Sequence, residues 1–169
     1  MRPDVSHLFA GPGCDLSIRS IWEDLCIHGL KVPWHKLVWF PGRIPKHSTI
    51  LWMTILDRLP TRMRLLRMGL NIDNDKCLFY DTEHESCNHL LFGCGFAQEL
   101  WGNVLSLCGV KRCVSAWDKE LAWASQLLKG KTFIVQVLKL ALAGHVYNIW
   151  RERNNRLFGG RGRMVGDAE

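Results

Sequence analysis

Apolar positions recur along most of this chain with the spacing of an α-helix. Residues 47–59 follow that period and have Ser48 as a predicted N-terminal cap. A shorter helix should begin after Thr61, whose hydroxyl can cap it, and end at Gly69. The pattern over 132–158 is apolar on nearly every side, which predicts a buried central helix.

Further helices are expected over 21–28, over 88–109 with a break near Gly93 and Gly95, and over 117–128. Prolines at three positions between 32 and 45 forbid a continuous helix there, so this stretch should be irregular or briefly extended. No segment alternates like a half-buried strand. The predicted fold class is therefore mainly α, a helical domain with an inserted small loop that resembles a zinc hairpin.

Composition agrees with a single globular domain and narrows its environment. The chain has 169 residues, of which 47% are hydrophobic and 22% charged. Seven cysteines, an odd number in a domain of this size, favour reduced thiols in an intracellular compartment. We see no secretory leader and no apolar run of membrane-spanning character, so a soluble protein without a membrane partner is expected.

The net charge of +6 is unevenly distributed. Between residues 31 and 67 basic residues greatly outnumber acids, of which Asp57 is the single example. Such a segment can contact phosphate, although a solvated basic face is an equally good interpretation. The candidate nucleic-acid ligands are Lys36, Arg43, Lys46, Arg58, Arg62, Arg64 and Arg67.

The residues between 77 and 94 are spaced like the ligands of a small zinc hairpin. Cys77, His89 and Cys94 supply three soft donors, and Tyr80 stands where a tight C-x2-C turn would have its second cysteine. A phenol is a poor zinc ligand beside thiolate and imidazole, so the fourth donor should be Cys87, His84 or water. A metal-free hairpin packed by its side chains is the alternative.

A dense, ordered series of residues surrounds these ligands. It comprises Val38-Trp39-Phe40, Ile44-Pro45-Lys46-His47, Trp52, Arg58-Leu59-Pro60-Thr61, Leu65, Gly69, Cys77, Glu85-Ser86, His89-Leu90-Leu91-Phe92, Cys94 and Leu100-Trp101. The series, which covers about residues 20–102, resembles the zinc-binding region found after the reverse transcriptase in plant LINE-type retrotransposons. Residues 147–154 resemble the segment that commonly follows in such proteins. The resemblance implies Cys77, His89 and Cys94 as zinc ligands, and Tyr80 departs from it.

Four parts are expected on this basis. Residues 1–20 form a loose leader, 21–109 the reverse-transcriptase-type zinc-binding domain, 110–158 a C-terminal helical extension, and 159–169 a flexible basic tail.

The expected function is a noncatalytic module that supports engagement of nucleic acid or ribonucleoprotein by a reverse transcriptase. Its partners would be RNA or DNA and the polymerase region of a polyprotein. The alternative is a structural or protein-interaction helical domain with a degenerate, metal-free hairpin.

Enzymatic activity is not expected. Polymerase chemistry needs paired carboxylates to hold divalent metals, and Tyr80-Asp81-Thr82 lacks the second acid. Glu83 and Glu85 are predicted to be solvated loop charges, and His145 a satisfied core or surface histidine. No glycine-rich phosphate loop opens a helix, and no small-molecule substrate is indicated.

Overall fold

A computed structural model of the chain describes residues 32–72, 74–80 and 83–159. The chain divides into two compact units, Met1–Val32 and Pro33–Glu169, and the description below concerns the second. The predicted leader, the predicted helix over 21–28 and all of the predicted basic tail after Gly159 lie outside the described residues.

The second unit is mainly helical, which confirms the predicted fold class. The single strand-like contact in its described part is an isolated antiparallel bridge between Lys76 and His84. The helical elements are α2 (His35–Val38), α3 (Pro45–Ile55), α4 (Arg62–Arg67), the π-helical turn η2 (His89–Gly93), α5 (Gly95–Leu107), α6 (Trp117–Leu127) and α7 (Phe133–Phe158).

Local signals determine several of these boundaries. Pro45 occupies the first turn of α3, where its missing N–H costs nothing, and the helix starts two residues before the predicted range. The predicted Ser48 cap is wrong, because Ser48 is buried inside the helix. The predicted cap of α4 is confirmed, because Thr61 Oγ1 accepts the N–H of Arg64 at 3.4 Å. Gly69 follows α4 with φ +83°, a left-handed conformation that glycine adopts without steric cost.

One stretch differs from the prediction. Residues 35–38 form the short helix α2 instead of an extended piece, with the N–H groups of Leu37 and Val38 both bonded to Trp34 O. The prolines at 33 and 41 lie outside this single turn and therefore do not prevent it. Leu37 and Val38 are buried against the core.

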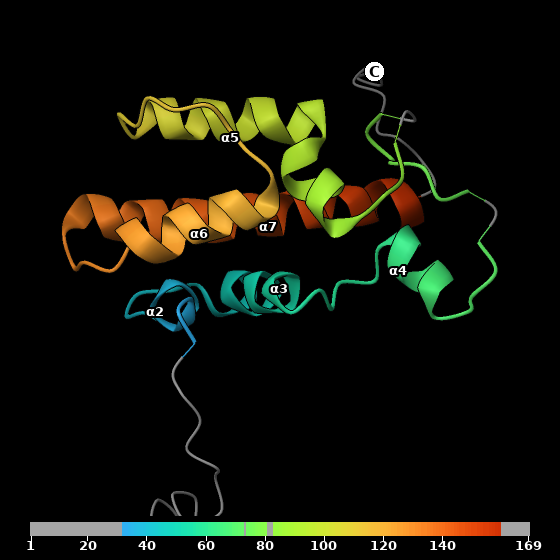
Figure 1. Cartoon of the computed structure of the whole chain (residues 1–169), viewed down its shortest axis with the longest axis horizontal. Helices are drawn as coiled ribbons and strands as arrows, with labels where there is room; N and C mark the ends of the chain where they lie inside the picture. The colour runs from blue at the N-terminus through green and yellow to red at the C-terminus, as the bar shows by residue number, and fades with distance from the viewer. Residues whose placement is uncertain (1–31, 73, 81–82, 160–169) are drawn as a thin grey trace, which may run out of the picture. The chain divides into compact units, whose positions relative to one another are not determined.

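The longest helix, α7, is the centre of the unit, as its all-round apolar pattern predicts. It packs against α3 on one side and against α5 and η2 on the other (Figure 1). Contrary to our expectation, α7 is long and apolar enough to span a membrane by length and composition, alone among the described helices. Its apolar side chains, including Leu142, Val146 and Ile149, build the hydrophobic core of this unit.

Candidate metal centre

The loop between α4 and η2 folds into a minimal hairpin. The N–H of Cys77 bonds to Glu83 O at 2.8 Å, and the N–H of Glu85 bonds to Asp75 O at 2.8 Å. Asn74 Oδ1 accepts the N–H of Lys76 at 2.8 Å at the entrance. These few bonds place Cys77 on the arm that faces η2.

Glu85 anchors this hairpin and corrects the sequence interpretation. We expected a solvated loop charge, but Glu85 is 0% exposed and Arg153 of α7 is only 2% exposed. Arg153 Nη2 donates to Glu85 Oε1 at 2.8 Å, and the backbone N–H of Arg62 donates to the same oxygen at 3.0 Å. A buried carboxylate is tolerable only when it is paired and hydrogen-bonded, and α7 supplies the partner.

The structure brings the three predicted ligands together. One donor atom from each of Cys77, His89 and Cys94 lies within 4.8 Å of the other two, and all three residues are buried. The sulfurs of Cys77 and Cys94 are 4.0 Å apart. A disulfide needs about 2.0 Å, whereas two thiolates on one tetrahedral zinc at about 2.3 Å lie roughly 3.8 Å apart. The pair therefore has the spacing of a metal site.

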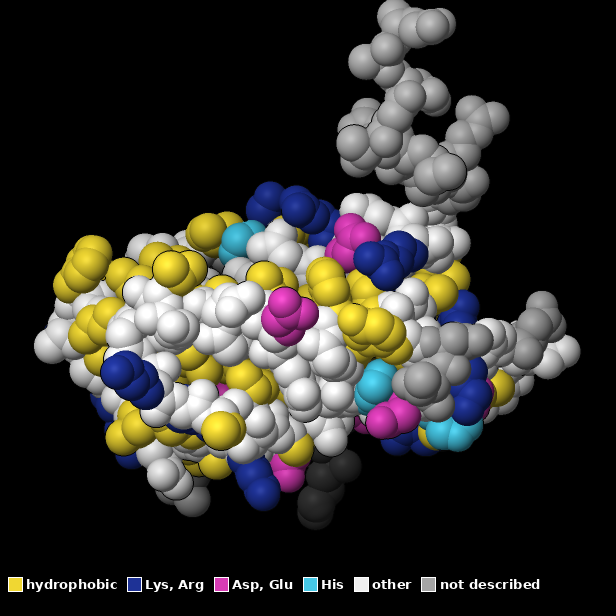
Figure 2. Space-filling view, turned by 90° about the horizontal axis from the view of Figure 1, so that it is seen from above, with side chains coloured by type: hydrophobic (Ala, Val, Ile, Leu, Met, Phe, Trp, Pro, Cys, Tyr) yellow, Lys and Arg dark blue, Asp and Glu magenta, His cyan; other side chains and the backbone are white. Residues whose placement is uncertain are grey.

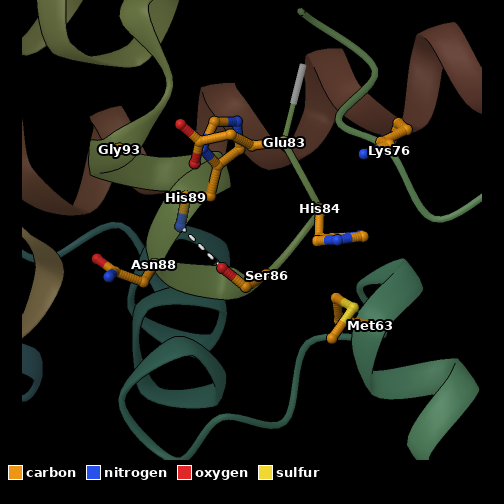
Figure 3. A pocket seen from close by; sticks show the side chains of 8 residues that line it. All are labelled: Met63, Lys76, Glu83, His84, Ser86, Asn88, His89 and Gly93. Atoms are coloured by element: carbon orange, nitrogen blue, oxygen red, sulfur yellow. Dashed lines mark hydrogen bonds and ion pairs between the residues drawn. The ribbon is translucent and has the colours of Figure 1, made fainter. Parts of the chain in front are cut away.

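The π-helical turn explains how His89 and Cys94 come to share a side. In an α-helix, residues five apart are rotated by about 140° beyond a full turn. Here the N–H of Cys94 bonds to His89 O at 2.6 Å, an i→i+5 contact that widens the turn and aligns the two residues. Ser86 Oγ accepts the N–H of His89 at 3.1 Å and steadies the start of the turn (Figure 3).

The unpartnered ring nitrogens of His89 also fit a metal site. Both ring nitrogens of His89 are buried without a hydrogen-bond partner, although Glu83 Oε2 lies 3.0 Å from Nδ1 out of line for a hydrogen bond. Burial raises the pKa of the Cys94 thiol, and the neighbouring Cys77 raises it further, against the backbone N–H groups of Phe96 and Ala97. Bound zinc would satisfy one of these imidazole nitrogens and would release the protons of the two thiols.

The candidates for a fourth ligand lie elsewhere. Cys87 is buried but outside the three-residue group, and burial, with the nearby Asp57 carboxylate, raises its pKa to about 12. His84 is exposed and its Nδ1 lies 2.6 Å from Asp75 Oδ2. Tyr80 is 51% exposed, and its ring packs over Gly95. Among the described residues, the structure therefore shows three convergent donors.

A cleft of about 390 Å³ opens beside His89. Figure 3 shows its lining side chains, which come from α4, the hairpin and η2. They are Met63, Lys76, Glu83, His84, Ser86, Asn88, His89 and Gly93.

The seven basic residues predicted to contact phosphate lie on α2, α3, α4 and the loops between them. Arg62 and Arg64 are half-buried and donate to the backbone carbonyls of Lys76 and Asp57. Arg67 pairs with the Asp57 carboxylate at 3.3 Å. Five of the seven are exposed, namely Lys36, Arg43, Lys46, Arg58 and Arg67.

A basic cluster that the sequence interpretation missed surrounds Tyr147 on α7. Lys46 Nζ lies 5.2 Å from the Tyr147 ring centroid and Arg151 Cζ 5.8 Å from it, while His47 stacks on the ring at 4.3 Å. Burial lowers the pKa of His47, and the charges of Lys46 and Arg151 lower it further. The signal was the i, i+4 spacing of Tyr147 and Arg151, which places both on one side of a helix. We call Lys46, His47, Tyr147 and Arg151 the Tyr147 cluster.

On the α5 side of the unit, the basic side chains are dispersed. Figure 2, viewed from the α5 side, shows Lys and Arg side chains in separate groups among hydrophobic and uncharged ones. In Figure 1, α2 and α3 lie on the other side of α7 from α5. Two of the predicted phosphate contacts, Lys36 on α2 and Lys46 on α3, therefore lie on helices of that other side.

Comparison with known families agrees with the geometry. A family model described as zinc-binding in reverse transcriptase matches residues 16–101, just over half of the chain. The chain belongs to this family of reverse transcriptase zinc-binding domains. No curated protein and no solved structure matches it.

Proposed function

We propose that this chain is a noncatalytic accessory module of a plant LINE-type retrotransposon reverse transcriptase, which binds zinc and helps the polymerase to engage nucleic acid. Family membership supports the zinc-binding and reverse-transcriptase parts of the proposal. The ordered series of matching residues supports the plant LINE-type origin. The two fully buried carboxylates among the described residues, Glu85 and Glu120, are each paired with an arginine, which favours a structural role for them over metal-dependent catalysis.

Zinc would be held by Cys77, His89 and Cys94 and would act as a structural crosslink. The metal would join the hairpin arm to the junction of η2 and α5, two segments that otherwise share few hydrogen bonds. After expression in zinc-supplemented medium, we expect about one zinc per chain. A Cys94→Ser variant should lose it, whereas Cys113→Ser, at an exposed cysteine outside the site, should keep it. Equal zinc content in the two variants would contradict this assignment.

The Tyr147 cluster carries the nucleic-acid part of the proposal. Lys46 and Arg151 are exposed and converge from α3 and α7 on one aromatic ring. No acidic residue occurs between positions 32 and 56 to neutralise the surrounding surface. Cationic side chains beside an aromatic ring suit a phosphate backbone with neighbouring bases, and Lys36, Arg43 and Arg58 would extend the contact.

Salt-dependent binding tests this surface. Fluorescence anisotropy with labelled single-stranded RNA, single-stranded DNA and duplex DNA should show affinity that falls as salt rises. Lys46→Gln/Arg151→Gln should weaken binding about tenfold and reduce the salt slope by roughly 2. The matched control is Lys111→Gln/Lys119→Gln, which removes two exposed positive charges outside the cluster. No binding at low salt, or equal losses in both variants, would refute the nucleic-acid role.

A second candidate function rests on a different observation. Ile44, Trp52 and Leu56 are exposed along α3, with Trp39 beside Trp52 at a centroid distance of 6.2 Å. Exposed aromatic and aliphatic side chains of this kind anchor protein interfaces. If the chain binds the polymerase region through α3, Trp52→Ser should abolish co-purification with that region and leave nucleic-acid binding unchanged.

A further inference from the structure

Among the residues that the structure describes, three protein donors converge at the candidate metal site, and the fourth position has none. We infer that the fourth coordination position is open to an exogenous monodentate ligand, water or a small thiolate. This inference rests on the proposed zinc binding by Cys77, His89 and Cys94.

The other described side chains that could complete the coordination lie outside the donor group or contact other residues. Tyr80 lies over Gly95 and is half exposed, so its ring is turned to solvent and to the start of α5. Cys87 lies outside the donor group, and burial together with the Asp57 carboxylate raises its pKa. His84 is held at 2.6 Å by Asp75. Among the described residues, three protein donors leave the fourth position without a ligand, which is the arrangement of an open zinc site and not of a closed four-ligand structural site.

A cleft opens beside the histidine of the donor group. His89 lines it together with Gly93 and Glu83 (Figure 3). A Cβ at position 93 would lie 3.4 Å from His89 Nδ1, at the edge of van der Waals contact. Glycine at this position leaves the space beside the ring unobstructed.

Glu83 is placed to orient His89. Its Oε2 is 3.0 Å from Nδ1, its side chain is 68% exposed on the cleft, and it does not belong to the donor group. A metal-bound histidine commonly gives its second ring N–H to a carboxylate, which fixes the tautomer. Glu83 Oε2 is out of line for a hydrogen bond in this structure, but rotation of its exposed side chain would bring it onto Nδ1–H and leave the Nε2 lone pair for the metal. Glu83 is thus a positioning residue.

The donor set also indicates the class of incoming ligand. Two thiolates neutralise the charge of a divalent zinc, and the imidazole adds none. A neutral, soft centre of this kind accepts water or a thiolate more readily than a bulky polyanion. The cleft has both signs of charge from Lys76 and Glu83, so it does not select strongly for a charged ligand.

Cobalt substitution separates this inference from the proposed zinc binding. In thiol-free buffer with a phosphine reductant, the first measurement is cobalt bound per chain, and a chain that binds none refutes zinc binding itself. The cobalt-loaded protein is then titrated with 2-mercaptoethanol. We expect the thiolate-to-cobalt charge-transfer absorption to rise by about half, because three thiolates replace two.

Two variants at residue 80 give the matched controls. Tyr80→Cys supplies the missing thiolate from the chain, so its starting absorption should equal that of the thiol-saturated wild type and should not respond to 2-mercaptoethanol. Tyr80→Phe removes only the hydroxyl and should respond like the wild type. A cobalt-loaded wild type that does not respond, an equal response in Tyr80→Cys, or loss of the wild-type spectrum in Tyr80→Phe would overturn the open position.

The role of Glu83 is tested by metal affinity. Glu83→Gln should weaken cobalt binding by about 10-fold to 100-fold, Glu83→Asp should recover part of the loss, and the metal-free proteins should melt at the same temperature. Glu99→Gln, at an exposed position on α5, is the control. Unchanged affinity in Glu83→Gln would overturn the positioning role and leave the open site to be judged by the thiol titration.

Discussion

Glu85 and Glu120 are both buried carboxylates that need a charged partner. The partners of Glu120 are close to it in the sequence, whereas the arginine that pairs with Glu85 is distant. Both carboxylates are 0% exposed, and both are held by an arginine together with a backbone N–H group. The Glu120 oxygens accept two hydrogen bonds from Arg112, at 2.6 and 2.8 Å, and one from the Trp101 indole at 3.1 Å. Every partner of Glu120 thus lies within the 101–120 stretch.

Glu85 is tied across the whole fold instead. Arg153, its buried partner, follows it by 68 residues and lies on α7, beyond the stretch 16–101 that matches the family model. Closing a loop of that length costs more chain entropy than closing the short one around Glu120. The hairpin that carries Cys77 therefore depends on the C-terminal helix, and the matched region alone lacks a buried contact that supports its own site.

Removal of Arg153 should have the largest effect. Arg153→Met leaves Glu85 as a buried charge without its partner, and we expect a loss of about 3–5 kcal/mol in unfolding free energy. Urea unfolding followed by far-UV circular dichroism measures the loss. The companion Glu85→Gln/Arg153→Met should recover part of it, because the uncompensated charge is gone. A loss below about 1 kcal/mol would show that the hairpin does not rely on α7.

Acid should lower the free energy of unfolding for the regions around Glu85 and Glu120 together, through His145. Its ring packs between Phe92 and Trp101, its Nε2–H donates to Leu91 O at 3.0 Å, and burial lowers its pKa to about 4. The unfolded chain therefore takes up a proton first, near pH 6.5, and the folded chain only near pH 4.

The contribution of neutral His145 is fully present above pH 6.5 and is lost as pH falls from 6.5 to 4. The total amounts to about 3 kcal/mol. His145→Gln keeps a donor for Leu91 and should remove this slope in urea-unfolding free energy against pH. An unchanged slope in the variant would assign the acid sensitivity to other groups.

Removal of the metal should destabilise the region around Glu85 and leave the region around Glu120 unaffected. With free zinc at about 100 times its dissociation constant, binding adds about 2.7 kcal/mol, which chelation removes. Hydrogen exchange should then speed up for amides of the 75–94 segment, while those of α6 stay protected. Equal acceleration in both would mean that the metal stabilises the fold as a whole.

The smallest effect is expected at the local site. Arg112 is 21% exposed, and without it Glu120 would keep the N–H groups of Trp101 and Ser115. Arg112→Leu should therefore cost about 1–2 kcal/mol, less than Arg153→Met. The comparison is made under the same urea conditions, and a reversed order would show that sequence separation does not govern these sites.

Sequence alone accounted for most of the helices. The periodicity of α3, α5, α6 and α7, the Thr61 cap and the left-handed Gly69 are local features whose causes lie within a few residues. The donor triad was also predictable, because zinc chemistry restricts its ligands to a few residue types at recurrent spacings.

Tertiary structure decided the rest. In the sequence, Glu85 looks like a solvated loop charge, because its partner Arg153 comes from a distant helix. The alignment of His89 with Cys94 depends on a π-helical turn that local propensities do not predict. The exclusion of Cys87 from the donor group was equally hidden. The physical reason is common to all three. Helix periods and caps depend on neighbours in the chain, whereas burial of a charge and convergence of ligands depend on partners that only the folded chain supplies.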